Sequence, residues 1–177
     1  MKALFAISLL AALALGAPAC SSGGPSGEAP VGPLVFAPEA ATGGAVVFLA
    51  ARPVLGDRLA FDVVARGAPQ IHGAAFRLTW DPEALAFVSA ERGEVWSKQV
   101  LALAKEGAGG QLAIAWTEKG MSGAVDATED KILGTVTFDA RGRKASSVGF
   151  KIERSTLVDR KGAHLPVTWR GGSIAAR

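Results

Sequence analysis

The feature that most constrains the fold is an alternation of apolar and polar residues on either side of an Asp-Pro pair. It lies in residues 76–94, FRLTWDPEALAFVSAERGE. The first five residues place large apolar side chains at every second position, which is the pattern of a β-strand with one buried face. Asp81-Pro82 favours a turn, and LAFVSA continues beyond it as a second strand. We therefore expect a hairpin that buries Phe76, Leu78 and Trp80 and presents the residues between them on an outer face.

The same short-strand pattern continues along the chain, with turn residues between the segments. In KILGTVTFDA we expect Ile132, Val136 and Phe138 to point inward, and in 122–131, SGAVDATEDK, we expect a helical turn. Alternation without helical crossovers predicts an all-β protein, an antiparallel β-sandwich. The other predicted strands are AVVFLA, DRLAFDVVAR, QVLALAK, QLAIAWTE, SVGFKIE, LPVTW and GGSIAAR.

The N-terminus has the pattern of an export signal. Lys2 precedes an apolar run that stops at Gly16 and is short for a membrane span. APAC follows and ends at Cys20, the only cysteine. This resembles a bacterial lipobox, so residues 1–19 are predicted to be a lipoprotein signal peptide and Cys20 the lipidated residue. The alternative is an ordinary signal peptide that happens to contain a cysteine.

Residues 20–44 are rich in Gly, Pro and Ser and predict a tether to one domain, residues 45–177. Val35 and Phe36, in its one apolar patch, are expected to dock on the domain as an additional edge segment. The net charge of +3 falls to +2 once Lys2 is removed with the signal. So small a charge, without a basic stripe, argues against a nucleic-acid partner.

The order of the motifs resembles a cohesin domain. GDRLAFDVVARG followed by GAAFRLTWDPEALAFVSAERGE is similar to the beginning of that family, and LVDRKGAHLPVTWRGGSIAA to its end. The resemblance spans residues 46–176. It implies a nine-stranded jelly roll without catalytic activity, whose partner is a dockerin, a small calcium-loaded module of polysaccharide-degrading enzymes.

The resemblance also implies a binding face. The positions where type I cohesins offer a polar pair are Gly73 and Ala75 here, and Ala115 stands where a larger apolar contact is common. Glu118 matches a glutamate of the family and is expected at the rim of the face. The surface of small residues suits a partner helix or sheet, or equally the protein's own tether. The predicted partner-binding residues are Ala75, Arg77, Thr79, Ala113, Ala115, Thr117 and Glu118.

The residue inventory argues against an enzyme. His72 and His164 are interpreted as surface residues, because no serine motif of the nucleophile-elbow type accompanies them. The lone cysteine excludes a Cys-based zinc site. The acidic cluster of Asp126, Glu129 and Asp130 lacks the alternating pattern of a calcium loop. No cofactor or metal is therefore predicted.

Two other functions remain open at this stage. Trp80 and Trp116 point inward by alternation, whereas the patterns around Trp96 and Trp169 leave their direction open. If exposed and coplanar, Trp96 and Trp169 would form a platform for polysaccharide, which makes a carbohydrate-binding lipoprotein the alternative. A structural component of an envelope assembly is the third possibility. Ser21 after Cys20 favours the outer membrane or cell surface over the inner membrane.

Overall fold

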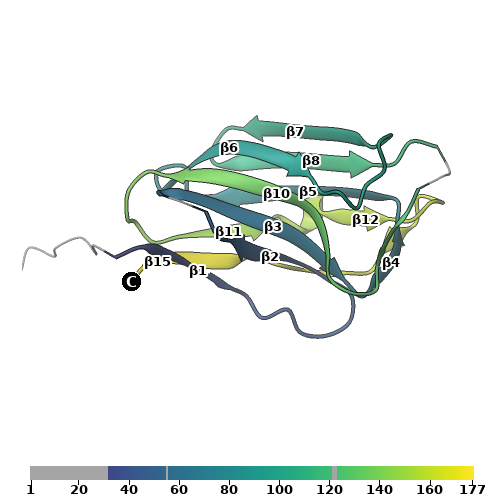
Figure 1. Ribbon diagram of the computed structural model, residues 1–177, viewed down its shortest axis with the longest axis horizontal. Helices are drawn as coiled ribbons and strands as arrows, with labels where there is room; N and C mark the ends of the chain where they lie inside the picture. Colours follow the sequence, from purple (N-terminus) through teal and green to yellow (C-terminus); the bar gives the residue numbers. More distant parts are fainter. Residues whose placement is uncertain (1–31, 55, 121–122) are drawn as a thin grey trace, which may run out of the picture.

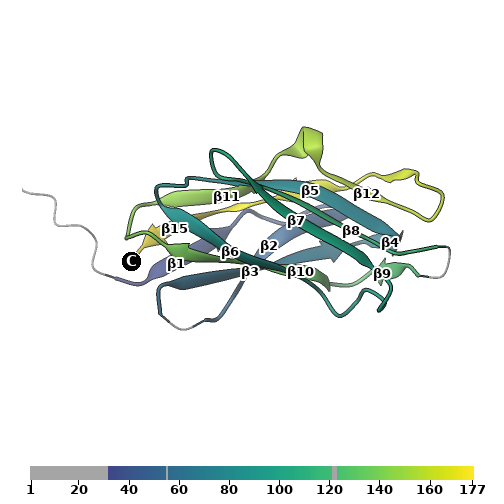
Figure 2. The same ribbon diagram turned by 90° about the horizontal axis from the view of Figure 1, so that it is seen from above.

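Two β-sheets pack face to face in the computed structural model, which describes residues 32–54, 56–120 and 123–177. The two layers are seen edge-on in Figure 2. Sheet A consists of β1 (Leu34–Pro38), β5 (Gly73–Trp80), β7 (Leu101–Gly107), β8 (Gln111–Thr117), β11 (Ser146–Phe150), β12 (Thr156–Val158), β13 (His164–Leu165) and β15 (Gly172–Ala176). Sheet B consists of β2 (Val46–Arg52), β3 (Arg58–Arg66), β6 (Leu85–Arg92), β10 (Lys131–Ala140) and β14 (Thr168–Arg170).

The pairing is antiparallel throughout both sheets except between β14 and β2, which run parallel. In sheet A, β8 lies on one side of β5, while β11 and β12 share its other side (Figure 1). A single 3-10 turn, η1 (Ile152–Arg154), separates these two strands. The predicted antiparallel sandwich is confirmed. The described residues contain fifteen strands rather than nine, several of them only two to four residues long.

The core forms where the inward side chains of the two sheets meet. Phe61, Trp80 and Phe138 make one aromatic cluster, with the Trp80 and Phe138 ring centroids 5.1 Å apart. Phe76 and Trp116 belong to a second cluster, with ring centroids 5.4 Å apart in an edge-on arrangement. Such tilted contacts are the favoured geometry of aromatic pairs. The inward direction predicted for Phe76, Trp80 and Trp116 is confirmed.

The predicted turn at Asp81 is also present. An Asp81 carboxylate oxygen accepts a hydrogen bond from the Glu83 backbone N–H at 2.9 Å, which is the usual way an aspartate stabilises a turn. The Trp80 indole N–H donates to the Leu85 carbonyl at 3.1 Å and ties the two strands together across the turn. The two strands do not pair with each other, however. β5 belongs to sheet A and β6 to sheet B, so the turn connects the two sheets, and the predicted hairpin is wrong although the burial pattern of β5 is as expected.

One inward assignment is wrong because β10 contains a bulge. The register with β3 shifts between Ile132 and Gly134, so the strand carries one residue without a direct partner. Leu133 is consequently buried, whereas Ile132, expected to point inward, is 38% exposed. Val136 and Phe138, beyond the bulge, are fully buried as predicted.

The segment 122–131 is the second local correction. The expected helical turn is absent from its described residues, 123–131. They contain β9 (Val125–Ala127), which pairs with β4 (Ala68–Ile71) as a small separate ribbon. Val125 and Ala127 are buried while Asp126 between them is exposed, which is the alternation of a strand.

The end of the predicted tether belongs to the fold. β1 pairs antiparallel with β15 at the edge of sheet A, with Phe36 opposite Ile174. The Phe36 ring lies 4.7 Å from the ring of Phe61. The docking expected of Val35 and Phe36 is therefore found, and the sheet begins at Leu34, inside the segment assigned to the tether.

Candidate functional site

Six of the predicted partner-binding residues share the outer face of sheet A. The register of β5 and β8 sets Ala75 opposite Ala115 and Arg77 opposite Ala113. Residues opposite one another in antiparallel strands project to the same side of the sheet. Thr117, opposite Gly73, and Thr79, opposite Gln111, extend this face in the two directions along the strands.

The edge strand β7 adds residues that the sequence analysis did not assign to the face. It pairs with β8 so that Leu101 lies opposite Thr117, Leu103 opposite Ala115 and Lys105 opposite Ala113. Leu101 is 52% exposed and Leu103 60%. Exposed leucines side by side on a strand are unusual outside an interaction surface.

On the other side of β5, the strand β12 contributes Thr156 opposite Ala75 and Val158 opposite Gly73. The face thus has a floor of small residues between the leucines of β7 and the larger side chains of β12. We call this surface the trough: its floor is Gly73, Ala75, Arg77, Ala113, Ala115 and Thr117, and its walls are Leu101, Leu103, Lys105, Thr156 and Val158.

The polarity of the trough changes along its length. At one end a nearly apolar hollow of about 220 Å³ is lined by residues that include Gly73, Ala75, Ala115 and Val158. Gly73 forms part of its floor, and a side chain there would meet the Thr117 hydroxyl and a Val158 methyl at 3.0 Å.

At the other end of the trough a polar depression of about 390 Å³ is lined by residues that include Arg77, Lys105, Gln111 and Glu106. The Arg77 guanidinium donates to the Gln111 side-chain oxygen at 3.4 Å. Among the described residues, neither Arg77 nor Lys105 forms an ion pair within 4.0 Å. Two cations are therefore available to a ligand at this end.

Glu118 does not lie at the rim, so that prediction is wrong. Its side chain turns inward and the residue is only 6% exposed. One carboxylate oxygen accepts the Ser97 backbone N–H at 2.7 Å and the other accepts the Ser97 hydroxyl. The backbone of Gly123 packs so closely that a Cβ there would lie 2.7 Å from the Glu118 carboxyl carbon. Glu118 thus fixes the loop that precedes β7.

The proposed polysaccharide platform is also wrong. Trp96 is 3% exposed and Trp169 is 7% exposed, so neither ring presents a face to solvent. The Trp96 indole N–H donates to the Leu133 carbonyl at 2.7 Å, which is how a buried indole is normally satisfied. Trp169 packs against Phe150, with ring centroids 5.0 Å apart. Both residues belong to the core between the sheets.

The histidines and the acidic cluster have structural partners. His72 Nδ1 lies 2.8 Å from the Gly123 carbonyl, and the exposed His164 Nδ1 lies 2.6 Å from the Thr156 hydroxyl. Hydrogen bonds from Arg66 lower the pKa of the Asp130 carboxyl, and those from Thr128 lower the pKa of Asp126. No group of three or more potential metal ligands occurs in the described part of the chain.

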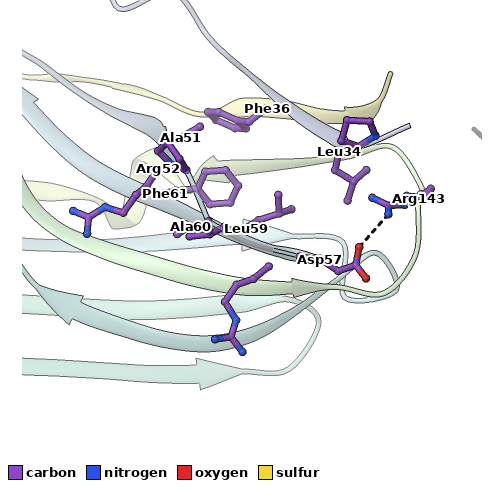
Figure 3. Close-up of a pocket in the computed structure, with 14 residues that line it drawn as sticks. Leu34, Phe36, Ala51, Arg52, Asp57, Leu59, Ala60, Phe61 and Arg143 are labelled. Carbon is purple, nitrogen blue, oxygen red and sulfur yellow. Dashed lines mark hydrogen bonds and ion pairs between the residues drawn. The ribbon is translucent and has the colours of Figure 1, made fainter. Parts of the chain in front are cut away.

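A second cavity, of about 450 Å³, opens between β1 and β3 (Figure 3). Leu34, Phe36 and Phe61 supply apolar lining. The three arginines of its lining each have a carboxylate partner: Arg143 pairs with Asp57 at 3.1 Å, Arg58 with Asp139 and Arg52 with Asp62. Because these charges are already neutralised, the cavity offers no free cation to a ligand, unlike the trough.

No family model and no curated protein matches this chain. Solved structures do match. A type I cohesin–dockerin complex from Clostridium thermocellum aligns with a TM-score of 0.61 and 14% identity, over 78% of this chain and 98% of the other. A type II cohesin domain from the cellulosome of Acetivibrio cellulolyticus gives 0.60 and 14%, over 73% and 95% of the two chains.

A non-cellulosomal cohesin from the archaeon Archaeoglobus fulgidus aligns with a TM-score of 0.55 and 15% identity, over 72% of this chain and 88% of the other. At such identities the likeness establishes the fold. The chain has the cohesin fold, as the order of its sequence motifs indicates. Among the described residues no helix is both long and apolar enough to cross a bilayer.

Proposed function

We propose that this protein is a non-catalytic docking module, which a lipid on Cys20 anchors to the bacterial envelope and which binds a dockerin-like protein in the trough. The observation that carries the proposal is the outer face of sheet A. Small residues on two central strands lie beside the exposed Leu101 and Leu103, which together form an open apolar surface. Apolar surface of this kind on a folded domain favours a protein partner.

The solved relatives of this fold support a protein partner. Several of them are complexes of a cohesin with a dockerin, from Acetivibrio cellulolyticus and Clostridium thermocellum. The strand β1, which the tether segment contributes to the described structure, does not compete for the trough, because it lies beside β15 at the far edge of sheet A. A dockerin-like partner would connect the protein to polysaccharide degradation.

The anchor rests on the sequence of residues 1–20, which lie outside the described part of the chain. An export signal that ends at the only cysteine supports lipidation of Cys20 and a location at the outer membrane or cell surface. Twelve residues between Cys20 and Pro33 would hold the domain about 20 Å from the bilayer on average.

The anchor is tested by detergent phase separation. Wild-type protein from a bacterial host should enter the detergent phase, and its N-terminal peptide should carry the mass of acyl chains. Cys20→Ser should move the protein to the aqueous phase. If the wild-type and Cys20→Ser proteins partition alike, the lipid anchor is wrong.

The docking face is tested with a matched pair of substitutions. The purified chain is immobilised with calcium present, and proteins of the source organism are captured and eluted with a chelator. Ala115→Arg places a long cation in the floor of the trough. Thr137→Arg places one on the outer face of sheet B, where Thr137 lies opposite Ala60 and Ser89.

We expect a protein that is released by chelation, and we expect Ala115→Arg but not Thr137→Arg to abolish its capture. Circular dichroism should show that both variants keep the fold. Equal capture by the two variants would show that the trough is not the binding site.

A further inference from the structure

We infer that the partner lays an acidic amphipathic helix along β8, with a small apolar side chain in the hollow and carboxylates over Arg77 and Lys105. This inference rests on the docking function proposed above and specifies the chemistry of the partner. Three features of the trough carry it: its width, the direction in which its polarity changes, and its free cations.

The width of the trough fits a helix. Its leucine wall on β7 and its other wall on β12 are three strand spacings apart, because β8 and β5 lie between them. Strands in a sheet are about 4.8 Å apart, which gives about 14 Å between the walls. A helix with its side chains is about 10–12 Å wide. The η1 turn, with Ile152 65% exposed, rises above sheet A in Figure 2 and continues the β12 wall.

The polarity changes along the strands rather than across them. One row across the sheet holds Thr117 and Leu101, and the next row holds Ala75, Ala115 and Leu103. Both of these rows are largely apolar. The third row holds Arg77, Ala113 and Lys105, and the fourth begins with Thr79 and Gln111. A ligand that matches this gradient has to extend along the strand direction.

The spacing of the rows matches the spacing of side chains on a helix. Two residues along a strand advance about 6.6 Å, the distance from the Ala115 row to the Ala113 row. Residues i and i+4 of a helix lie about 6.0 Å apart along its axis and on the same face. A small apolar residue in the hollow therefore places the residue four positions away above the cations.

The charge at this end of the trough is positive after its neighbours are counted. Arg77 and Lys105 form no ion pair within the described chain. Glu106 also lines the depression, but one carboxylate beside two cations leaves a net positive charge. On η1, Glu153 is already paired with Lys151 at 3.6 Å. Aspartate or glutamate on the partner is the complement of this surface.

The test is a selection of helices displayed on phage, with six surface positions of one helix randomised. The target is the purified full chain in detergent, in four forms: wild type, Arg77→Glu with Lys105→Glu, Ala115→Arg, and Arg141→Glu. Arg141 is exposed and forms no ion pair within the described residues, so the last variant is the charge-reversal control. Affinities of the selected helices are then measured for all four forms.

We expect wild type to select Ala or Val four positions from Asp or Glu, and the doubly reversed variant to select Lys or Arg in place of the acidic residue. Reversing the charges of Arg77 and Lys105 should weaken the affinity for the acidic helices about tenfold or more. Reversing the charge of Arg141 should weaken it less than about twofold. If Ala115→Arg abolishes binding of the selected helices but these helices show no preference for acidic residues, this inference is wrong while the proposed docking face stands. If no selected helix is sensitive to Ala115→Arg, the proposed function is wrong as well.

Discussion

Replacing Glu118 with Ala should destabilise the fold without removing a direct contact to the partner. The residue is 6% exposed, and both of its carboxylate oxygens accept hydrogen bonds from Ser97. A hydrogen bond to a charged group contributes about 1.5–3 kcal/mol. Because Ser97 itself is exposed, water can replace part of the hydrogen bonding that Ser97 loses in the variant. We therefore expect Glu118→Ala to lower the free energy of unfolding by about 2 kcal/mol.

Two further variants separate the causes. Glu118→Gln keeps an oxygen that accepts the Ser97 N–H but loses the charge, so we expect it to cost about 1 kcal/mol. Glu94→Ala removes an exposed carboxylate on the same loop and should change the unfolding free energy by less than about 0.5 kcal/mol.

The assay is urea unfolding followed by the fluorescence of the four tryptophans, all of which are buried. With a slope of about 2 kcal/mol per molar urea, the expected loss shifts the Glu118→Ala midpoint by about 1 M. A Glu118→Ala protein as stable as wild type, but with weakened capture of its partner, would refute this reasoning. That result would return Glu118 to the rim of the binding face.

Four further perturbations test other parts of the structure. Gly134→Ala sets a Cβ 2.2 Å from the Trp116 ring and 2.5 Å from the Glu91 carbonyl, and should cost about 2–3 kcal/mol in a urea titration, where an unchanged midpoint would contradict the close packing. Trp96→Phe removes one of the two hydrogen bonds that the Leu133 carbonyl accepts, because the Gly93 backbone N–H still donates to it at 2.8 Å, and should cost about 1 kcal/mol. A wild-type fluorescence change on adding polysaccharide would contradict the burial of the tryptophans. Leu103→Lys should abolish partner capture with less than about 0.5 kcal/mol of lost stability, and a clear loss of stability would place Leu103 in the core. Lys144 donates to Asp81 and lowers the pKa of that carboxyl. The stabilisation from this pair is therefore complete above pH 3.8, the ordinary pKa of the carboxyl, and disappears as the pH falls through the lowered pKa. Lys144→Met should be less stable than wild type at neutral pH and equally stable in strong acid, and a stability difference that persists in acid would exclude this ion pair as its cause.

The sequence predicts the sandwich because alternation is a local property. Phe76, Leu78 and Trp80 need only the period of two and a partner sheet to be assigned to the core, and all three are buried. The same rule extended by one residue beyond Thr117 would have turned Glu118 inward. The resemblance to a family glutamate assigned Glu118 to the rim of the binding face instead, whereas the alternation along this strand assigns it to the core.

Other features escape local patterns. The bulge that exposes Ile132 and buries Leu133 depends on how β10 matches β3, a strand about 70 residues earlier in the chain. The direction of Trp96 and Trp169 is likewise decided by contacts with Leu133 and Phe150, which are distant in sequence. These assignments require the pairing of strands, which the amino-acid pattern of one strand does not contain.

The leucines of β7 lie between these two cases. β7 and β8 form a hairpin around the turn after Gly107, and its register places Leu103 opposite Ala115. Recognising this hairpin in the sequence would have added β7 to the predicted face. The strand is exposed along all seven of its residues and carries one lysine, which protects little of a free edge. Exposed Leu101 and Leu103 on a free edge strand favour self-association, which lysines at these positions would oppose. Leu101 and Leu103 beside a floor of alanines are what the proposed docking surface requires of its edge strand.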